Sequence, residues 1–301
     1  MRLAITLGDP RGIGAEIVRK ALASPKVSAL GAEWVVVGPS GTEQPVDVSI
    51  GDWDAQAPSA ASAGRLAGRA IERAAQMALA GEVHGMVTAP LDKAALHAGG
   101  YDYPGHTEML GVLAGCHTTM MLASERLRVV LATTHIALRD VVGALTHDVI
   151  VETARATIHG LRDGFGISEP RVALCALNPH AGDGGRFGTE DDALLAPAAR
   201  AAGIAGPFPA DTVFVRALSG EFDAVIAPYH DVGMTAIKVA SFGSAVNITF
   251  GLPFVRTSPD HGTALDIAGL GIASAASMIV AMEQAVRLAR RGLVRAEQGA
   301  G

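Results

Sequence analysis

The sequence predicts a layered α/β fold in which parallel strands are covered by helices. Three observations lead to this prediction. Short apolar runs alternate with helical stretches along the chain, which is typical of parallel α/β domains. The 301 residues, 49% of them hydrophobic, are enough to bury a sizeable core. Several of the apolar runs also end on polar residues, as strands do at the sheet edge where α/β proteins bind ligands.

The first third of the chain follows this pattern in order. Strands are expected at residues 3–7, 33–38 and 84–89, and helices at residues 16–22 and 64–80. The strand, helix, strand succession favours parallel pairing. Residues 40–62 are polar and contain prolines, and we expect a surface excursion there.

The later elements are read in the same way. Two β-rich runs at residues 120–123 and 129–133, separated by a charged turn, predict a hairpin. Thr107 or His106 is expected to cap a helix at residues 109–115. Further helices are expected at residues 148–161, 190–202 and 273–291, further strands at 172–176 and 225–227, and a frayed tail over the last eight or so residues.

Composition limits the classes of function. A formal net charge of −6 and a pI near 5.9 argue against a nucleic-acid or anionic-membrane partner. Cys116 and Cys175 lack CxxC spacing, so a disulfide framework and a thiolate metal site are not expected. The opening residues have strand chemistry, and the apolar window at 267–282 is too short to cross a bilayer. We therefore expect neither export nor a membrane segment, and a cytoplasmic location.

The first turn is rich in glycine. Gly8, Gly12 and Gly14 lie between the first strand and the first helix, where free amide groups can receive a phosphate or carboxylate. The segment has neither the GxGxxG register nor GK[ST], so the dinucleotide fingerprint and the P-loop are absent. A plain turn at a strand end is the alternative interpretation.

Three histidines share one setting. His135, His180 and His230 each follow the carboxyl end of an apolar run. Neutral imidazole is a common metal ligand, and three imidazoles with an open position form a catalytic coordination pattern. Each histidine taken alone is more often a hydrogen-bonded structural residue, and the spacing of the three matches no local metal motif.

A cationic group and an acidic turn complete the candidates. Lys238 and Arg256, with Asn247 between them, are suited to hold a phosphate or carboxylate, although Lys238 on an exposed helix face would have no such role. Residues 260–266 (DHGTALD) predict a turn followed by a helix start, with a carboxylate able to accept two ribose hydroxyls.

Eight ordered motifs give the chain a family resemblance over almost its whole length. They are GDPRGIGAE, VTAPLDK, PGHTE, TTHIALRD, NPHAGDGG, PADT, YHDVG and GLPFVRTSPDHGTALDIAG. In this order they resemble the 4-hydroxythreonine-4-phosphate dehydrogenases of pyridoxal phosphate biosynthesis. The last motif also resembles the cofactor loop of isocitrate and isopropylmalate dehydrogenases, which share the wider fold group.

The resemblance implies a two-domain α/β/α fold of the isocitrate and isopropylmalate dehydrogenase type, with the active site in the interdomain cleft. It implies a discontinuous first domain, residues 1–105 plus 262–301, and a second domain, residues 106–261, that carries metal and substrate residues and the interface of a homodimer. Substrate would be bound by His106, Thr107, Lys238, Asn247 and Arg256.

The implied metal is one zinc, magnesium or cobalt ion held by His135, His180 and His230, with His230 reaching the site from the second subunit. The implied cofactor site runs over His261, Gly262, Thr263 and Ala264 at the adenosine and Asp266 at its ribose. A free carboxylate at the ribose disfavours a ribose phosphate, so NAD is preferred to NADP.

The implied reaction is NAD-dependent oxidation of 4-phosphohydroxy-L-threonine to 2-amino-3-oxo-4-phosphooxybutanoate, followed by decarboxylation to 3-amino-2-oxopropyl phosphate. Asp211 is the candidate for taking the hydroxyl proton, and Lys238 is either the acid or a phosphate clamp. Arg11 and Ala15 stand where the family usually has alanine and proline, and Val232 where it often has glutamine.

These departures put the substrate in question. Related dehydrogenases act on threonate or erythronate 4-phosphate or on aromatic dihydrodiol dicarboxylates. A phosphate acyltransferase of the same architecture and a catalytically silent binding protein are the alternatives from other classes, and neither needs three histidines at strand ends.

Overall fold

The computed structural model describes residues 1–241 and 245–298, with side chains described through residue 292. The chain forms two compact units, Met1–Thr118 with Val246–Gly301, and Thr119–Ala245. These bounds differ from the expected 1–105 plus 262–301 and 106–261. The last two strands of the first unit pair with each other and with an earlier strand of that unit, which assigns them there.

The first unit is built on a sheet with the strand order β3-β2-β1-β4-β11-β10. All pairs are parallel except β10 with β11, which confirms the expected parallel pairing. The strands are β1 (Arg2–Thr6), β2 (Glu33–Ser40), β3 (Val48–Asp52), β4 (Gly85–Thr88), β10 (Val246–Phe250) and β11 (Val255–Pro259). The helices are α1 (Gly14–Leu22), α2 (Pro25–Ser28), α3 (Ala60–Leu79), α4 (Lys93–Ala98), α5 (His106–Ala114) and α11 (Ala276–Gln298).

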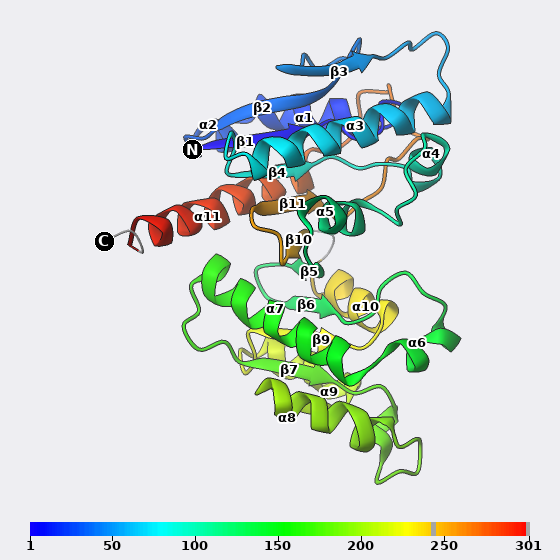
Figure 1. The fold of residues 1–301 in the computed structure, drawn as a ribbon, viewed down its shortest axis with the longest axis vertical. Helices are drawn as coiled ribbons and strands as arrows, with labels where there is room; N and C mark the ends of the chain where they lie inside the picture. The colour runs from blue at the N-terminus through cyan, green and yellow to red at the C-terminus, as the bar shows by residue number, and fades with distance from the viewer. Residues whose placement is uncertain (242–244, 299–301) are drawn as a thin grey trace. The chain divides into compact units, whose positions relative to one another are not determined.

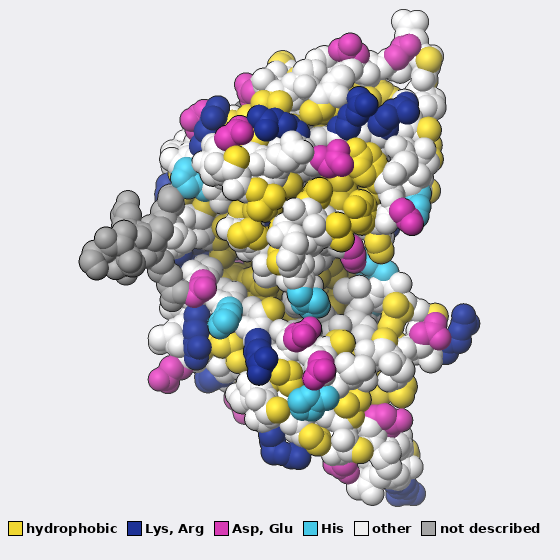
Figure 2. Space-filling model, viewed as in Figure 1, with side chains coloured by type: hydrophobic (Ala, Val, Ile, Leu, Met, Phe, Trp, Pro, Cys, Tyr) yellow, Lys and Arg dark blue, Asp and Glu magenta, His cyan; other side chains and the backbone are white. Residues whose placement is uncertain are grey.

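Helices cover both faces of this sheet. Alternate strand residues such as Ala4, Val35 and Met86 pack in one core cluster with helix α3 and with Met109 of α5. Helix α11 packs against β11, β4 and β10 and contacts α1. Figure 1 shows α3 lying alongside the strands of this unit, and Figure 2 shows Lys and Arg side chains in a row over the region of α3. The apolar side of α3 is therefore buried and its basic side is at the surface.

Three expectations for this unit are wrong in detail. The segment 40–62 contains strand β3, which pairs with β2, because the valine and isoleucine of this polar stretch extend the sheet edge. Helix α5 begins at His106 with Gly105 as its N-cap and no side-chain cap, so neither His106 nor Thr107 caps it. Residues 260–266 form turns and no helix starts there; α11 begins at Ala276.

The expected frayed tail is not found at residues 294–298, where α11 continues to Gln298. Residues 299–301 lie outside the described part of the chain.

The second unit has the strand order β5-β6-β9-β7-β8. The hairpin β5–β6 is antiparallel, as predicted, and the other pairs are parallel. Its strands are β5 (Thr119–Ala123), β6 (Arg128–Leu131), β7 (Val172–Cys175), β8 (Ala205–Phe208) and β9 (Ala224–Ala227). Its helices are α6 (Leu138–Ala144), α7 (His147–Phe165), α8 (Ala196–Ala202), α9 (Ala210–Leu218) and α10 (His230–Ser241), with a 3₁₀ turn at Pro179–Gly182 and a π-helical turn at Asp191–Leu195.

The core of the second unit lies between this sheet and helices α9 and α10. Val129, Ala173 and Val225 of the central strands pack with Phe214 of α9 and Ile237 of α10. Helix α7 contacts the same strands and also packs on α8. Sequence analysis missed β8, α6 and α9, which are short elements in segments without a strong apolar period.

Both cysteines are free. None of the helices in the described residues is both long and apolar enough to span a bilayer.

Candidate active site

The three strand-end histidines lie at one edge of the second unit's sheet. His135 follows β6, His230 follows β9 and His180 follows β7, and these three strands are parallel neighbours. Because parallel strands point their carboxyl ends the same way, the expected convergence at one sheet edge is found.

Two of these histidines are close together. The ring centroids of His135 and His230 are 5.7 Å apart with their planes at 44°. Two bonds tie the loops that carry them: the Ala132 amide donates to the Ala227 carbonyl at 2.9 Å, and the Thr133 hydroxyl donates to the Pro228 carbonyl at 2.7 Å. Both rings line a small cavity of about 140 Å³.

The setting of His230 fits that of a metal ligand. His230 Nδ1 is 2.7 Å from Asp231 Oδ1, so the carboxylate orients the ring and leaves Nε2 for a ligand. Such a carboxylate behind the imidazole is a common companion of metal-ligating histidine. Among the described residues of this single chain, no three His, Cys, Asp or Glu side chains are grouped closely enough to hold an ion.

His180 is held in an unusual backbone conformation. Its φ is +53°, and the next residue, Ala181, has a φ of +54°, a region that side chains other than glycine seldom adopt. The preceding residues are fixed by Asp191, a fully buried carboxylate. It accepts hydrogen bonds from the Leu177 amide (2.8 Å), the Asn178 amide (3.0 Å) and Asn178 Nδ2 (3.0 Å).

The first unit holds a second group of site candidates around a buried arginine. Arg256 on β11 has only 2% of its surface exposed. Among the described residues its guanidinium donates only to two hydroxyls, Thr249 Oγ1 at 3.1 Å and Thr88 Oγ1 at 2.8 Å, and its Nε has no partner. Burial lowers the pKa of the Arg256 guanidinium to about 10, so it stays charged at neutral pH.

Other polar atoms near Arg256 also lack partners. His106 Nε2 and Asn247 Oδ1 are buried and have no hydrogen-bond partner among the described residues. Burial, with the charges of Arg256 and Lys93, lowers the pKa of His106 well below its usual value, so its imidazole is neutral. A buried cation beside unpaired polar atoms indicates a site for an anionic ligand with hydroxyl or amino groups.

The start of helix α5 belongs to this group. His106 and Thr107 are its first two residues, and its N-cap, Gly105, has no side chain to accept hydrogen bonds from the first amides. Free amides and the helix dipole at such an end favour an anion. Four of the predicted substrate residues are thus on the first unit: His106, Thr107, Asn247 and Arg256.

The remaining predicted residues, Lys238 and Asp211, are on the second unit. Lys238 is exposed in the last turn of α10, and Asp211 is exposed in the first turn of α9.

The predicted cofactor loop follows β11. Ile13 donates its amide to the Thr263 carbonyl at 3.0 Å, which joins this loop to the start of α1. Gly12 is required here, because a Cβ on it would lie 2.7 Å from the same carbonyl oxygen. Ala264 has a φ of +44°, and His261 Nε2 is buried without a partner in the described structure. Asp266 is exposed.

Next to this loop is a cavity of about 860 Å³ within the first unit. Leu265, Ala268 and Gly269 line one side of it, and the turn after β1, with Arg11 and Gly12, lines another. The predicted cofactor residues His261, Gly262, Thr263, Ala264 and Asp266 flank the cavity without lining it.

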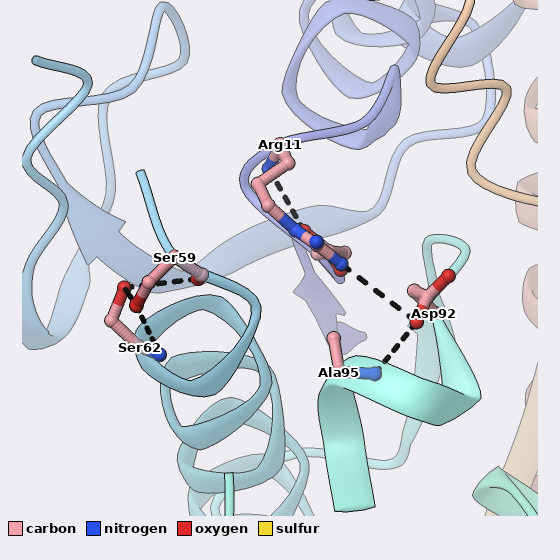
Figure 3. Close-up of polar contacts among 6 residues, drawn as sticks. Arg11, Ser59, Ser62, Asp92 and Ala95 are labelled. Atoms are coloured by element: carbon pink, nitrogen blue, oxygen red, sulfur yellow. Dashed lines mark hydrogen bonds and ion pairs between the residues drawn. The ribbon is translucent and has the colours of Figure 1, made fainter. Parts of the chain in front are cut away.

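Arg11 joins two turns beside this cavity. Its side chain donates to the buried Asp9 carboxylate at 2.7 and 3.1 Å and lies 3.7 Å from Asp92, the residue that caps helix α4 (Figure 3). The same view shows Ser59 capping α3 through the Ser62 amide. The two carboxylates compensate the charge of Arg11. The hydrogen bonds of Arg256 go instead to two hydroxyls, and the nearby charge of Glu108 only partly offsets the lowering of its pKa by burial.

Comparison with known proteins decides the family. A family model described as "Pyridoxal phosphate biosynthetic protein PdxA" matches residues 17–285. The chain belongs to this family. A 4-hydroxythreonine-4-phosphate dehydrogenase of Desulfosudis oleivorans is 41% identical over 94% of this chain and 95% of its own. A D-threonate 4-phosphate dehydrogenase of Salmonella typhimurium is also 41% identical, over 95% of this chain and 98% of its own.

Solved structures agree with the predicted family and fold class. The crystal structure of a 4-hydroxythreonine-4-phosphate dehydrogenase from Klebsiella pneumoniae is 40% identical, covers 96% of this chain and 99% of that chain, and has a TM-score of 0.82. Isocitrate dehydrogenase from Methylococcus capsulatus, at 17% identity and a TM-score of 0.54, shares the fold. The predicted resemblance to this family and to the isocitrate dehydrogenase fold group is confirmed.

Several residues of the site in this PdxA-family chain were not found from the sequence. Thr88 and Thr249 accept hydrogen bonds from the predicted residue Arg256, and Asp191 accepts from Leu177, which precedes the predicted residue His180 by three positions. Trp53 lines the large cavity from the segment that was expected to be a surface excursion. The only sequence signal for Thr88 was its place at the carboxyl end of an apolar run.

Proposed function

We propose that this chain is an NAD-dependent, divalent-metal-dependent dehydrogenase that oxidises 4-phosphohydroxy-L-threonine at its secondary alcohol, with decarboxylation of the β-keto acid to 3-amino-2-oxopropyl phosphate. Membership of the PdxA family and the dehydrogenase names of the relatives support this class of reaction. The structural observation that carries the proposal is Arg256, a buried guanidinium whose described partners are two uncharged hydroxyls.

That observation favours an anionic substrate for a physical reason. Glu108 raises the pKa of Arg256, but burial still lowers it overall. Burying a charge that has no hydrogen-bonded counter-ion costs several kcal/mol, and a bound phosphate or carboxylate offsets this through short charge-assisted hydrogen bonds. His106 Nε2 and Asn247 Oδ1 remain for the other polar groups of the same molecule. A neutral His106 can hydrogen-bond to a hydroxyl without adding a third positive charge to the group.

The metal proposal uses the strand-end histidines. In this proposal His135 and His180 of one subunit supply two imidazoles, and His230 of the partner subunit supplies the third, so that the complete set forms at the interface of a homodimer. A bound metal would polarise the substrate oxygen, and a bound nicotinamide would provide the hydride acceptor. Zinc, magnesium and cobalt are the candidate ions.

The protein groups of the proposed mechanism bind and move protons. Arg256, with His106, Thr107 and Asn247, fixes the anionic substrate. Asp211, or a water bound to it, takes the proton of the substrate's secondary hydroxyl. The hydride leaves the carbon that carries this hydroxyl, so the alcohol becomes a ketone. Lys238 then donates the proton that replaces carbon dioxide, or contacts the phosphate.

The cofactor proposal rests on the loop at His261–Asp266 and the adjoining cavity. His261, Gly262, Thr263 and Ala264 lie at the adenosine, and Asp266 binds the ribose hydroxyls. NAD is preferred to NADP for an electrostatic reason. Among the described residues that line the cavity, the one cation is Arg11, and Asp9 and Asp92 compensate its charge. Glu43, which also lines the cavity and pairs with Arg19, adds a negative charge that disfavours a ribose phosphate. A cytoplasmic location accompanies this proposal.

A second substrate is favoured by a specific observation. Relatives named D-threonate 4-phosphate dehydrogenase are as similar to this chain as those named for 4-hydroxythreonine 4-phosphate. The two compounds differ at carbon 2, where an amino group replaces a hydroxyl. A relative acting on a dihydrodiol, terephthalate 1,2-cis-dihydrodiol dehydrogenase from Burkholderia xenovorans, is less similar, at 28% identity and a TM-score of 0.66.

The test is anion recognition by Arg256. NADH formation is measured with NAD, a divalent metal and 4-phosphohydroxy-L-threonine, for the wild type, Arg256→Met and the surface control Arg171→Met. Arg171 pairs with Asp223 at the surface, so its loss is expected to leave turnover unchanged. Loss of a charged hydrogen-bonding partner is expected to lower kcat/KM by about 100-fold or more in the Arg256 variant. Equal activity of the two variants would contradict the proposal.

A further inference from the structure

The buried guanidinium of Arg256 lies between hydroxyl groups from the two neighbouring strands. In the sheet of the first unit, β11 has β4 on one side and β10 on the other. Thr88 Oγ1 on β4 accepts from Nη2 at 2.8 Å, and Thr249 Oγ1 on β10 accepts from Nη1 at 3.1 Å. Thr88 is fully buried and Thr249 is 4% exposed. Both contacts are therefore shielded from water.

These contacts fix the plane of the guanidinium. The group carries five N–H donors in a rigid planar arrangement. One hydrogen bond to each Nη, from opposite sides, prevents rotation of the plane, while Nε keeps its hydrogen unpaired. The Nε hydrogen and the remaining Nη hydrogens are then available to a bound anion.

Hydroxyl and carboxylate partners differ in whether they cancel the charge of the arginine. A carboxylate partner would orient the arginine and also cancel its charge, as Asp9 does for Arg11. A hydroxyl acceptor orients the group and leaves the charge for the ligand. Threonine at both positions thus gives a fixed and still cationic donor.

We propose that Thr88 and Thr249 are positioning residues that hold the Arg256 guanidinium in the orientation that binds the anionic group of the substrate. This inference rests on the proposed function, in which Arg256 contacts that group. Its alternative is that the two hydroxyls only satisfy buried donors and affect stability alone.

The chain provides a matched control for this distinction. Thr6 on β1 is fully buried and is the register partner of Thr88 on the adjacent strand. Its hydroxyl has no hydrogen-bond partner among the described residues. Thr6→Val therefore makes the same chemical change as Thr88→Val, in the same sheet and at the same burial, without touching Arg256.

The experiment compares the wild type with Thr88→Val, Thr249→Val, Thr6→Val and the conservative Thr88→Ser. Inorganic phosphate binding is measured by calorimetry, and kcat and KM are measured with 4-phosphohydroxy-L-threonine. Loss of one hydrogen bond to a charged group predicts a rise of about tenfold in the phosphate Kd and in KM for each of the Thr88 and Thr249 valine variants. We expect kcat to change by less than about twofold, Thr88→Ser to restore binding, and Thr6→Val to match the wild type.

A direct readout is the ¹⁵N spectrum of the Arg256 side chain, assigned with Arg256→Lys. Held Nη hydrogens give separate signals in the wild type and in Thr6→Val, and these signals merge in Thr88→Val. A wild-type Arg256 whose Nη hydrogens already average would overturn the proposal without any variant. So would a Thr88→Val protein that is less stable than Thr6→Val but binds phosphate equally well.

The outcomes separate this inference from the proposed function. If the wild type oxidises no candidate phosphate but phosphate binding and the spectra follow the predicted contrast, the proposed reaction fails and the positioning role stands. If the wild type turns over normally and Thr88→Val equals Thr6→Val in Kd and KM, the positioning role fails and the reaction stands.

Discussion

Asp191 is predicted to be the residue on which the His180 loop depends. The perturbation is Asp191→Asn, with Asp192→Asn as the control, because Asp192 is the next residue and is exposed. Asp191 accepts three N–H hydrogen bonds at 2.8 to 3.0 Å in a fully buried position. The asparagine keeps one acceptor oxygen but turns an NH₂ group toward donors of Asn178.

The magnitude follows from these contacts. Hydrogen bonds to a charged group contribute about 1.5–3 kcal/mol each, and a buried donor without a partner adds a similar cost. One or two such bonds are lost, so Asp191→Asn is expected to lower the free energy of unfolding by about 2–4 kcal/mol. The exposed control is expected to change it by less than about 0.5 kcal/mol.

The assay has two parts. Urea unfolding followed by circular dichroism gives the stability difference, and calorimetric titration with zinc gives the metal affinity. Because His180 follows the two residues that Asp191 holds, we expect the metal affinity to fall about 10-fold or more in Asp191→Asn. Unchanged stability in this variant would refute the assigned hydrogen bonds, and unchanged metal affinity with lowered stability would refute the link between Asp191 and the metal site.

Three further predictions use the first unit. Arg11→Met leaves the buried Asp9 carboxylate without its guanidinium, so the free energy of unfolding is expected to fall by about 2–3 kcal/mol. Adding Asp9→Asn to the same chain should restore part of the lost stability, as measured by a double-mutant cycle in urea unfolding. The pKa of His106 is lowered in the folded state, so on acidification the unfolded state binds a proton at a higher pH than the folded state does. The free energy of unfolding is therefore expected to fall as the pH drops below about 6.5. In His106→Asn the free energy of unfolding should depend less steeply on pH, and an equal dependence in the two proteins would contradict the burial of a neutral imidazole. Gly12→Ala places a methyl group against the Thr263 carbonyl, so the Kd for NAD is expected to rise about 10-fold or more by calorimetry, and an unchanged Kd would separate this turn from the cofactor site.

The fold was predicted well where the apolar period was strong. The strands at 3–7, 33–38 and 172–176 and the hairpin at 120–133 are found in the structure, with bounds within a few residues. Strand β3 was missed because its five residues carry only one valine and one isoleucine among polar neighbours. The return of β10 and β11 to the first unit depends on pairing with β4, which local sequence does not specify.

The site was predicted in two different ways. The polar residues at strand ends pointed to His135, His180 and His230, and the topology brings their strands together. Arg256 and Asn247 were singled out from the sequence as a possible anion site, and the role of His106 came from the family resemblance. All three have a buried polar atom without a hydrogen-bond partner among the described residues, which supports these proposed roles. Thr88, Thr249 and Asp191 could not be found from the sequence, because a buried threonine or aspartate is recognised as a support only when its distant partner is known.

Turnover of two substrates by the same wild-type preparation distinguishes the two candidate reactions. NADH formation and carbon dioxide release are followed with NAD, a divalent metal, and either 4-phosphohydroxy-L-threonine or D-threonate 4-phosphate, each beside its dephosphorylated form. We expect NADH and carbon dioxide in equal amounts from 4-phosphohydroxy-L-threonine. For its dephosphorylated form we expect a kcat/KM that is at least about 100-fold lower. Turnover of D-threonate 4-phosphate alone would move the substrate to the second candidate, and equal rates with and without phosphate would contradict an anion site built around Arg256.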